Sequence, residues 1–232
     1  MIGLTAPQMW YEARVMYEAI ASADAPGYTP RQWSMLLTQA QENIVMETLR
    51  LGFDFDELRR RVVHSLLNTE TLTLEEGQIE EYSLPNSYSI NLEEDYLHIV
   101  KDTANHSVKV KPVSYDFYHS NIENPFESPY KREFWRLLGK GSVIIITDGS
   151  ELTNYDITYI ERPEPIVVAE LSAQTAIEEY SDITHCKLDH SIHRQITIEA
   201  AKLAHAYTNN QIGYQIQSME SNRSRFGPQS QE

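Results

Sequence analysis

The sequence of 232 residues contains a single cysteine, Cys186, and only 9 glycines. One thiol excludes an internal disulfide and any zinc site built from several cysteines. Scarce glycine leaves little material for phosphate-binding loops, and the sequence has no glycine-rich nucleotide loop and no HExxH, GxSxG or CxxC motif. We therefore expect a protein that is not an enzyme and that has no catalytic, cofactor-binding or metal-binding residues.

Long apolar runs are also missing from the sequence. No segment approaches the length needed to span a bilayer. Residues 1–20 lack the basic start and the continuous apolar stretch of a secretory signal. We expect a protein that is made and assembled in a cytoplasm and has no membrane partner.

Basic residues are few, because 19 lysines and arginines stand against 34 acidic residues and leave a net charge of −15. None of them lies between Arg61 and Lys101, where the acidic residues are Glu70, Glu75, Glu76, Glu80, Glu81, Glu93, Glu94 and Asp95. Such an excess of acid repels nucleic-acid phosphates, so tight binding of DNA or RNA is disfavoured. A solvated face is the simpler interpretation of this 70–95 stretch, and a functional acidic surface is the alternative.

Tyrosine, by contrast, is abundant, with 14 copies. Its side chain supplies rigid, amphipathic contact area at a low entropic cost, which suits subunit interfaces. A tyrosine-rich β core would give the same count, so the composition alone leaves both interpretations open.

Apolar residues at helical spacing predict three helices within residues 1–70. The second helix has the best-defined start, because Thr29-Pro30-Arg31-Gln32 combines an N-cap, a proline in the first turn and a capping-box glutamine. Asp54 and Glu57 form a similar box before the third helix. A fourth helix is predicted over 189–208. The stripe that defines the first helix is Met9, Ala13, Met16 and Ile20.

Between residues 71 and 162 the pattern changes to short runs of Val, Ile, Thr and Tyr separated by turn residues, which is typical of strands. Asp148-Gly149 between two such runs predicts a hairpin. A short helix is predicted around 132–138. The candidate strands are 78–84, 96–103, 108–115, 143–147 and 154–161.

Together these patterns predict an α+β fold, in which a helical bundle of three N-terminal helices plus a C-terminal helix carries an inserted antiparallel β region. The predicted parts are a helical part (1–70), the inserted β region (71–165), a return to the bundle (166–210) and a flexible C-terminal tail (211–232). The tail prediction rests on many Gln, Ser and Asn residues and few apolar ones.

The strongest catalytic alternative is a histidine group, His185, His190 and His193, with Asp182 and Asp189 nearby. A metal site needs ligands that converge on one point, and the spacing of His190 and His193 permits this convergence without requiring it. We expect surface or capping histidines instead, with His193 packed against the bundle. The three tryptophans are expected in the core rather than on a ligand platform; they are Trp10, Trp33 and Trp135.

Several segments, taken in order, resemble a specific group of proteins. They are 36–45, 53–59, 124–129 (Asn-Pro-Phe-Glu-Ser-Pro), 159–166 (Tyr-Ile-Glu-Arg-Pro-Glu-Pro-Ile) and 186–193 with Ile196 and Ala200. The ordered set is similar to the head-to-tail connector, or ring, proteins of crAss-like tailed bacteriophages. The resemblance runs from about residue 30 to residue 205.

This resemblance implies a structural virion protein that forms a ring of roughly twelve copies in the phage neck. The implied partners are other copies of the chain, the portal protein or a neighbouring connector ring, and tail proteins, while genome DNA passes through without specific binding. No catalytic residue is implied. We expect the 70–95 stretch to project into the lumen or towards an adjoining ring. The alternatives are another tail or neck completion protein, or a small hydrolase.

Overall fold

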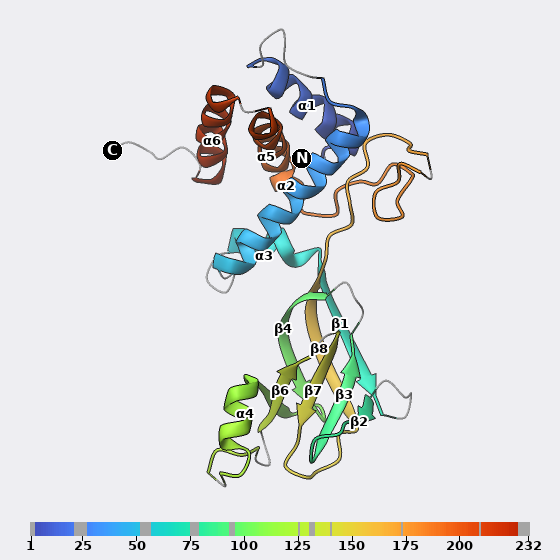
Figure 1. The fold of residues 1–232 in the computed structure, drawn as a ribbon, viewed down its shortest axis with the longest axis vertical. Coiled ribbons are helices and arrows are strands. Elements are labelled where there is room, and N and C mark those ends of the chain that lie inside the picture. The colour runs from blue at the N-terminus through green and yellow to red at the C-terminus, as the bar shows by residue number, and fades with distance from the viewer. Residues whose placement is uncertain are drawn as a thin grey trace, which may run out of the picture. The chain divides into compact units, whose positions relative to one another are not determined.

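The computed structural model describes residues 3–20, 27–51, 57–74, 79–92, 96–124, 126–129, 133–139, 141–172, 174–208 and 210–226. The chain forms two compact units (Figure 1). The helical unit contains Met1–Leu66 and Pro163–Glu232, and the sheet unit contains Leu67–Arg162. Asp54, Glu75, Glu76, Glu93, Glu94 and Asp95, which entered the predictions above, lie outside the described residues.

The helical unit consists of α1 (Ala6–Glu18), α2 (Pro30–Leu51), α3 (Glu57–His64), α5 (His193–Tyr207) and α6 (Gln211–Phe226). The predicted start of α2 is confirmed: the Thr29 N–H donates to Oε1 of Gln32 at 2.8 Å, and the Gln32 N–H donates to Oγ1 of Thr29 at 3.3 Å. This reciprocal pair satisfies two of the N–H groups that the first turn leaves without helical partners.

Helix α5 is the centre of the helical unit, since α1, α2 and α6 all pack against it. Tyr17 lies within the core, with its ring centroid 5.9 Å from that of Trp33 and 4.8 Å from that of His205. The Tyr28 hydroxyl donates to the Ala204 carbonyl at 2.8 Å, and burial raises the pKa of Tyr28 to about 12. The aromatic cluster therefore ties α1 and α2 to the C-terminal half of α5.

One face of α2 is polar and nevertheless buried, because it binds an extended segment of the chain. The backbone N–H groups of Ile166 and Val168 donate to the hydroxyls of Thr38 and Ser34, both at 3.0 Å. Nε2 of Gln41 donates to the Glu164 carbonyl at 2.8 Å. Side chains on successive turns of the helix thus satisfy one edge of this segment, while Val167 pairs with Thr184 on the other.

The sheet unit has eight strands in the order β1-β8-β4-β5-β6-β7-β3-β2. All neighbours are antiparallel except β5 and β6, which are parallel. The strands are β1 (Leu67–Thr73), β2 (Ile79–Glu81), β3 (Ser87–Asn91), β4 (Tyr96–Ala104), β5 (Val108–Pro112), β6 (Glu133–Leu138), β7 (Ser142–Ile146) and β8 (Asn154–Glu161).

This sheet curls until it is nearly closed and buries a core on each of its faces (Figure 1). The larger core contains Ile90, Phe134, Tyr155 and Ile157 among its members. Helix α4 (Tyr115–Asn121), which connects the parallel strands β5 and β6, covers the other face. The smaller core beneath it consists of Tyr118, Trp135, Leu137, Ile144 and Ile146.

A buried ion pair crosses the larger core. Nη1 of Arg136 donates to Oδ2 of Asp102 at 2.8 Å, and the two side chains are 9% and 7% exposed. The Tyr155 hydroxyl donates to the same oxygen at 2.8 Å. Burial, together with the adjacent Asp102 carboxylate, raises the pKa of Tyr155 well above its usual range. Strands β4, β6 and β8 are therefore joined through one carboxylate in the interior.

The predicted fold, a helical bundle with an inserted antiparallel β region, is wrong. The strands instead form a nearly closed mixed sheet of eight strands with cores of its own. The short helix predicted around 132–138 is strand β6. Phe134 and Trp135 are buried on opposite faces of that strand, so the alternation of polar and apolar residues that identifies a strand is absent.

The tail predicted as flexible over 211–232 is helical in its described part, because Gln211–Phe226 forms helix α6, which packs on α5; residues 227–232 lie outside the described residues. The abundant Gln and Ser residues that suggested a flexible tail include Gln217 and Ser221, which are 2% exposed in the contact between α6 and the rest of the unit. The polar composition of this segment therefore did not predict α6, because α6 packs through polar residues such as Gln217 and Ser221.

Candidate assembly surfaces

Two of the three candidate histidines, His185 and His193, form hydrogen bonds with the backbone of the N-terminal segment. Nδ1 of His193 accepts from the Leu4 N–H at 3.0 Å, and Nδ1 of His185 accepts from the Ala6 N–H at 3.1 Å. Nε2 of His193 lies 3.0 Å from the Leu188 carbonyl, which requires the tautomer that carries its proton on Nε2. Both imidazoles therefore serve as hydrogen-bond acceptors at the start of α1, and the predicted packing of His193 against the helices is confirmed.

His190 takes no part in that arrangement. Its side chain is 47% exposed, and its Nδ1 lies 3.8 Å from Oδ1 of Asp189. Asp189 caps the short 3-10 helix His190–Ile192 by accepting the Ser191 N–H at 2.9 Å. Hydrogen bonding to the Ser191 side chain, and then this backbone bond, lowers the pKa of the Asp189 carboxyl group. Among the described residues, no group of three or more His, Cys, Asp or Glu side chains is placed to hold a metal ion.

The tryptophans serve the cores, as expected for Trp33 and Trp135, which are each 1% exposed. Trp33 belongs to the aromatic cluster of the helical unit, and Trp135 lies beneath α4 with its ring centroid 5.3 Å from that of Phe117. Trp10 is half-buried on α1. These indoles stabilise the two units and do not form a ligand platform.

Helix α6 is oriented with its apolar side chains outward. Ile212, Ile216 and Met219 are 70%, 44% and 65% exposed, while Gly213, Gln217 and Ser221 are buried. The exposed residues follow one another at spacings of four and three, which places them on one stripe along the helix. We call these three side chains the α6 stripe. A surface helix of a monomeric protein would instead turn its apolar side chains towards the core and its polar side chains towards solvent.

The inner face of α6 lies unusually close to α5. A Cβ atom added to Gly213 would lie 2.4 Å from Nδ1 of His205, so only glycine fits at this position without displacing the ring. His205 is fully buried, its Nδ1 lies 3.4 Å from Nδ2 of Asn210, and burial lowers its pKa. Further along, Oγ of Ser221 donates to the buried Glu199 carboxylate at 3.5 Å.

Helix α1 presents a second apolar surface. Tyr11 and Val15, one turn apart, are 69% and 46% exposed. We call this pair the α1 stripe. Arg14 and Glu18 form an exposed ion pair at 2.6 Å beside it. The outward faces of α1 and α6 therefore both expose apolar side chains that the described residues of the chain do not cover.

The sheet unit exposes one aromatic side chain almost completely, since Phe126 is 94% exposed. Asn124 shapes the turn that carries it: Oδ1 of Asn124 accepts from the Phe126 N–H at 3.1 Å, and the Asn124 carbonyl accepts from the Ser128 N–H at 2.8 Å. Tyr115 at the start of α4 is 44% exposed. An almost fully exposed phenyl ring is the kind of anchor that protein interfaces use.

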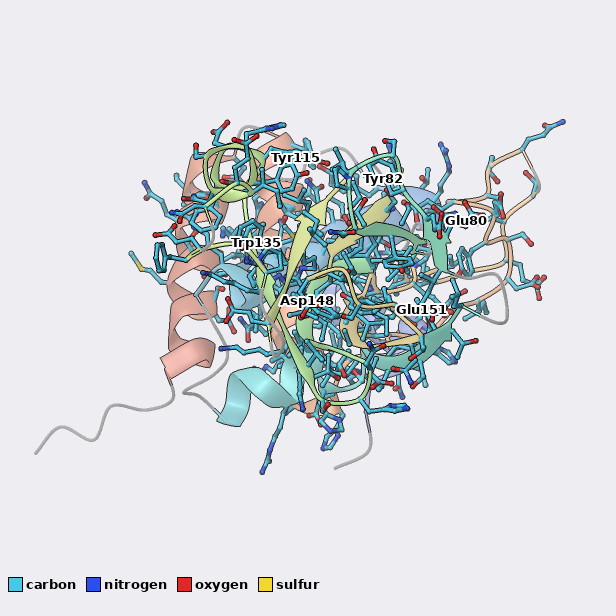
Figure 2. The ribbon with its side chains drawn as sticks, turned by 90° about the horizontal axis from the view of Figure 1, so that it is seen from below. Glu80, Tyr82, Tyr115, Trp135, Asp148 and Glu151 are labelled. Carbon is cyan, nitrogen blue, oxygen red and sulfur yellow. The ribbon has the colours of Figure 1, made fainter. Side chains whose placement is uncertain are left out.

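Figure 2 looks along the sheet unit and shows Tyr82 and Tyr115 towards one edge of the view and Glu80 and Glu151 towards another. Glu80 and Glu81 on β2 are exposed. Glu70 is different, because its Oε1 accepts from the Tyr159 hydroxyl at 2.8 Å and from Nδ2 of Asn68 at 3.2 Å. Of the acidic residues at 70–95 that the structure describes, Glu80 and Glu81 thus face solvent and Glu70 belongs to an internal hydrogen-bond cluster.

Within the described ranges, no helix has the length and the apolar character needed to cross a membrane.

Exposed apolar stripes and an exposed phenyl ring are features of surfaces that bind other proteins. The comparisons with known proteins give the class of this chain. The sequence model of the phage tail ring protein 3/4 family matches residues 4–215, and the chain belongs to this family. The chain is therefore a structural ring protein of a bacteriophage, and the predicted resemblance to the ring proteins of crAss-like phages is confirmed.

Two relatives come from one virus. The chain is 30% identical to "Ring protein 4/5" of Bacteroides phage crAss001 over 219 residues, which cover 84% of this chain and 90% of the relative. It is 26% identical to "Ring protein 3" of the same phage over 191 residues, which cover 74% of this chain and 82% of the relative.

The sequence contains one indication of the α6 stripe. Ile212, Ile216 and Met219 recur at helical spacing within the polar segment at 211–232. The exposure of Phe126 had no such indication, because one aromatic residue in a loop has no periodicity.

Proposed function

We propose that this chain forms a closed ring of roughly twelve copies in the connector between the portal and the tail of its phage. The observation that carries the proposal is the pair of outward apolar stripes on α1 and α6, in a chain that belongs to a family of phage tail ring proteins. Portal protein, a neighbouring connector ring and tail proteins are the proposed partners, and no catalytic function is proposed.

The geometry of a closed ring supports this assignment. In a ring of more than two subunits, each copy contacts its neighbours through two different surfaces. The chain offers two separate apolar surfaces on the helical unit, and its net charge of −15 leaves it unsuited to gripping the phosphates of nucleic acid.

Genome DNA is proposed to pass through the ring without specific binding, past acidic side chains such as Glu80 and Glu81. Like charges repel at short range, and this repulsion lowers friction for a moving duplex. We also propose that the helical parts, 1–70 and 166–210, act together as one functional module and that the β region, 71–165, acts as another. Assembly is proposed to take place in the host cytoplasm.

The test uses the recombinant full chain, alone and mixed with purified portal protein. Light scattering coupled to size-exclusion chromatography and negative-stain electron microscopy should show closed rings, free or seated on the portal. Antibody labelling of purified virions should mark the neck.

Two outcomes would contradict the proposal. Labelling confined to the capsid shell or the distal tail would favour a different structural role. A monomer that hydrolyses a small substrate, with turnover lost in His190→Ala, would favour an enzyme; His190 is suited to this control because it is exposed and its removal should leave the fold intact.

A further inference from the structure

The orientation of α6 requires an explanation beyond the fold of one chain. Its inner face consists of Gly213, Gln217 and Ser221, which contribute little apolar burial, while its best apolar side chains face outward. Within the described residues, Nε2 of His205 and Oε1 of Gln217, both in this contact, have no hydrogen-bond partner. The contact that holds α6 on α5 is thus polar and incompletely satisfied, and the apolar face of the helix remains available.

We propose that the α6 stripe of one subunit packs against the α1 stripe of the next copy in the ring, so that the subunits associate head to tail. This inference rests on the proposed function, because it assigns surfaces to the contact between copies. The interface is Ile212, Ile216 and Met219 on one side and Tyr11 and Val15 on the other.

The existence of two different apolar surfaces allows a head-to-tail arrangement. Helices α1 and α6 both pack against α5 (Figure 1), and they also meet where Nε2 of Gln217 donates to the Met16 carbonyl at 3.5 Å. The α6 stripe and the α1 stripe are different surfaces of one unit, so each copy can bind one neighbour with α6 and another with α1. A contact of α6 with α6 would use the same surface on both copies and would end at a dimer.

The spacing within each stripe suits helix packing. Residues four apart form the ridges that interlock when two helices cross, and both Tyr11 with Val15 and Ile212 with Ile216 have this spacing. Tyr11 supplies the large amphipathic side chain that is enriched among the energetically dominant residues of interfaces.

The size of the surface also favours a second copy within a ring over a stable two-chain complex. The three side chains of the α6 stripe expose on the order of 300 Å², against about 800 Å² that one partner buries in a standard stable complex. A contact of this size is weak alone. It gains strength when every subunit makes it twice and the ring closes, since closure turns the last contact into an intramolecular one.

Disulfide trapping tests the contact directly, using Val15→Cys and Ile216→Cys in the full chain. Cys186 gives little background, because it is buried and burial raises the pKa of its thiol to about 12. Under oxidation, the double variant should give a ladder of covalent oligomers on non-reducing gels, which a reductant collapses. A mixture of the two single variants should give dimers and nothing larger.

Two trapping outcomes would overturn the inference. A covalent dimer of Ile216→Cys alone, in the absence of the other variant, would show that α6 meets α6. A double variant that stays monomeric on the gel would show that the two stripes do not meet. Electron microscopy of the same samples reports ring formation separately: rings without cross-links refute this contact alone, and absence of rings from the wild-type chain, with and without portal protein, counts against the proposed function.

A charge placed on the stripe provides the second test. Ile216→Glu should abolish ring formation, while Ser218→Glu, which puts the same charge on the same helix off the stripe, should leave it unchanged. Circular dichroism should show an intact fold for both variants. Rings that survive Ile216→Glu would overturn the inference.

Discussion

The two units of this protein differ in how completely each one satisfies its own side chains. The sheet unit buries both faces of its sheet and pairs its interior charge, since Arg136 meets Asp102 at 2.8 Å. The helical unit buries an aromatic cluster around α5 but ends in a helix whose apolar face points outward. The interior charge of the sheet unit is thus paired within one chain, whereas α6 of the helical unit exposes an apolar face that we propose a neighbouring copy covers.

The largest predicted effect on stability comes from removing the buried ion pair of the sheet unit. Asp102→Ala leaves Arg136 charged and buried without its partner and should lower the free energy of unfolding by about 3–5 kcal/mol. Urea titration followed by circular dichroism measures this loss. The matched control is Glu133→Ala, which removes the exposed pair with Lys111 at 3.9 Å and should cost no more than about 1 kcal/mol. Equal losses in both variants would contradict our view of the interior pair.

The next effect concerns the close approach of α6 to α5. Gly213→Ala forces a methyl group against the His205 ring and should lower the free energy of unfolding by about 1–3 kcal/mol, as other overpacked sites do. Gln215→Ala, on the exposed side of the same helix, should have a negligible or slightly stabilising effect. Differential scanning calorimetry compares the two. A Gly213→Ala variant as stable as wild type would show that the helices are not in this contact.

A smaller effect follows from the pH dependence of the helical unit. Burial lowers the pKa of His205 below its ordinary 6.5, so the unfolded chain takes up a proton that the folded chain resists. The free energy of unfolding should therefore fall as the pH drops below about 6.5 and level off below the folded-state pKa.

The opposite limb of the pH profile involves Tyr28, whose pKa rises from 10.0 to about 12 on folding. A pKa raised in the folded state makes the unfolded chain release its proton first, so stability should also fall between about pH 10 and 12. Melting temperatures of wild type and Tyr28→Phe across this range provide the check. A difference between the two proteins that stays constant from pH 8 to pH 12 would contradict the assignment.

The smallest effect on stability is expected at the stripes themselves. Ile216→Glu changes an exposed position and should alter the free energy of unfolding of the monomer by no more than about 0.5 kcal/mol. Equilibrium unfolding by urea at a concentration too low for assembly measures this. A large loss would mean that Ile216 supports the fold of its own chain, and the contrast between the two units would disappear.

Local sequence patterns predicted those elements whose cause is local. The Thr29 and Gln32 capping box set the start of α2, and the helix predicted over 189–208 is α5. Strands β7 and β8 were also predicted, β8 from the alternation of Tyr155, Ile157 and Tyr159. In each case the residues that predict the helix or strand lie within that element or directly beside it. The hairpin predicted between β7 and β8 at Asp148-Gly149 is wrong, because β7 pairs with β6 and β3 while β8 pairs with β1 and β4.

The failures have tertiary causes. Strand β6 lies beneath α4 on one face and in the larger core on the other, so its sequence has no polar face. Strands β1 and β3 were not predicted, and β1 contains the polar residues Asn68 and Glu70, which are satisfied by Tyr159 on β8. The overall polar composition of 211–232 does not predict helix α6. The helical spacing of its few apolar residues does predict it.

The functional prediction had a different basis. No motif in the sequence predicts ring formation, and the family relationship supplied it. The structure adds the surfaces, because the exposure of Tyr11, Val15 and the α6 stripe could only be seen once the helices were packed. For the histidine group at 185–193 the sequence pattern was misleading. It suggested a metal site, but His185 and His193 accept hydrogen bonds from the backbone of the N-terminal segment.

The most direct measurement is a cryo-electron microscopy map of the assembled ring at side-chain resolution. Our account predicts that α6 of every subunit lies across α1 of the next, with Ile212, Ile216 and Met219 buried between them. A ring in which these three side chains face solvent in every subunit would contradict it.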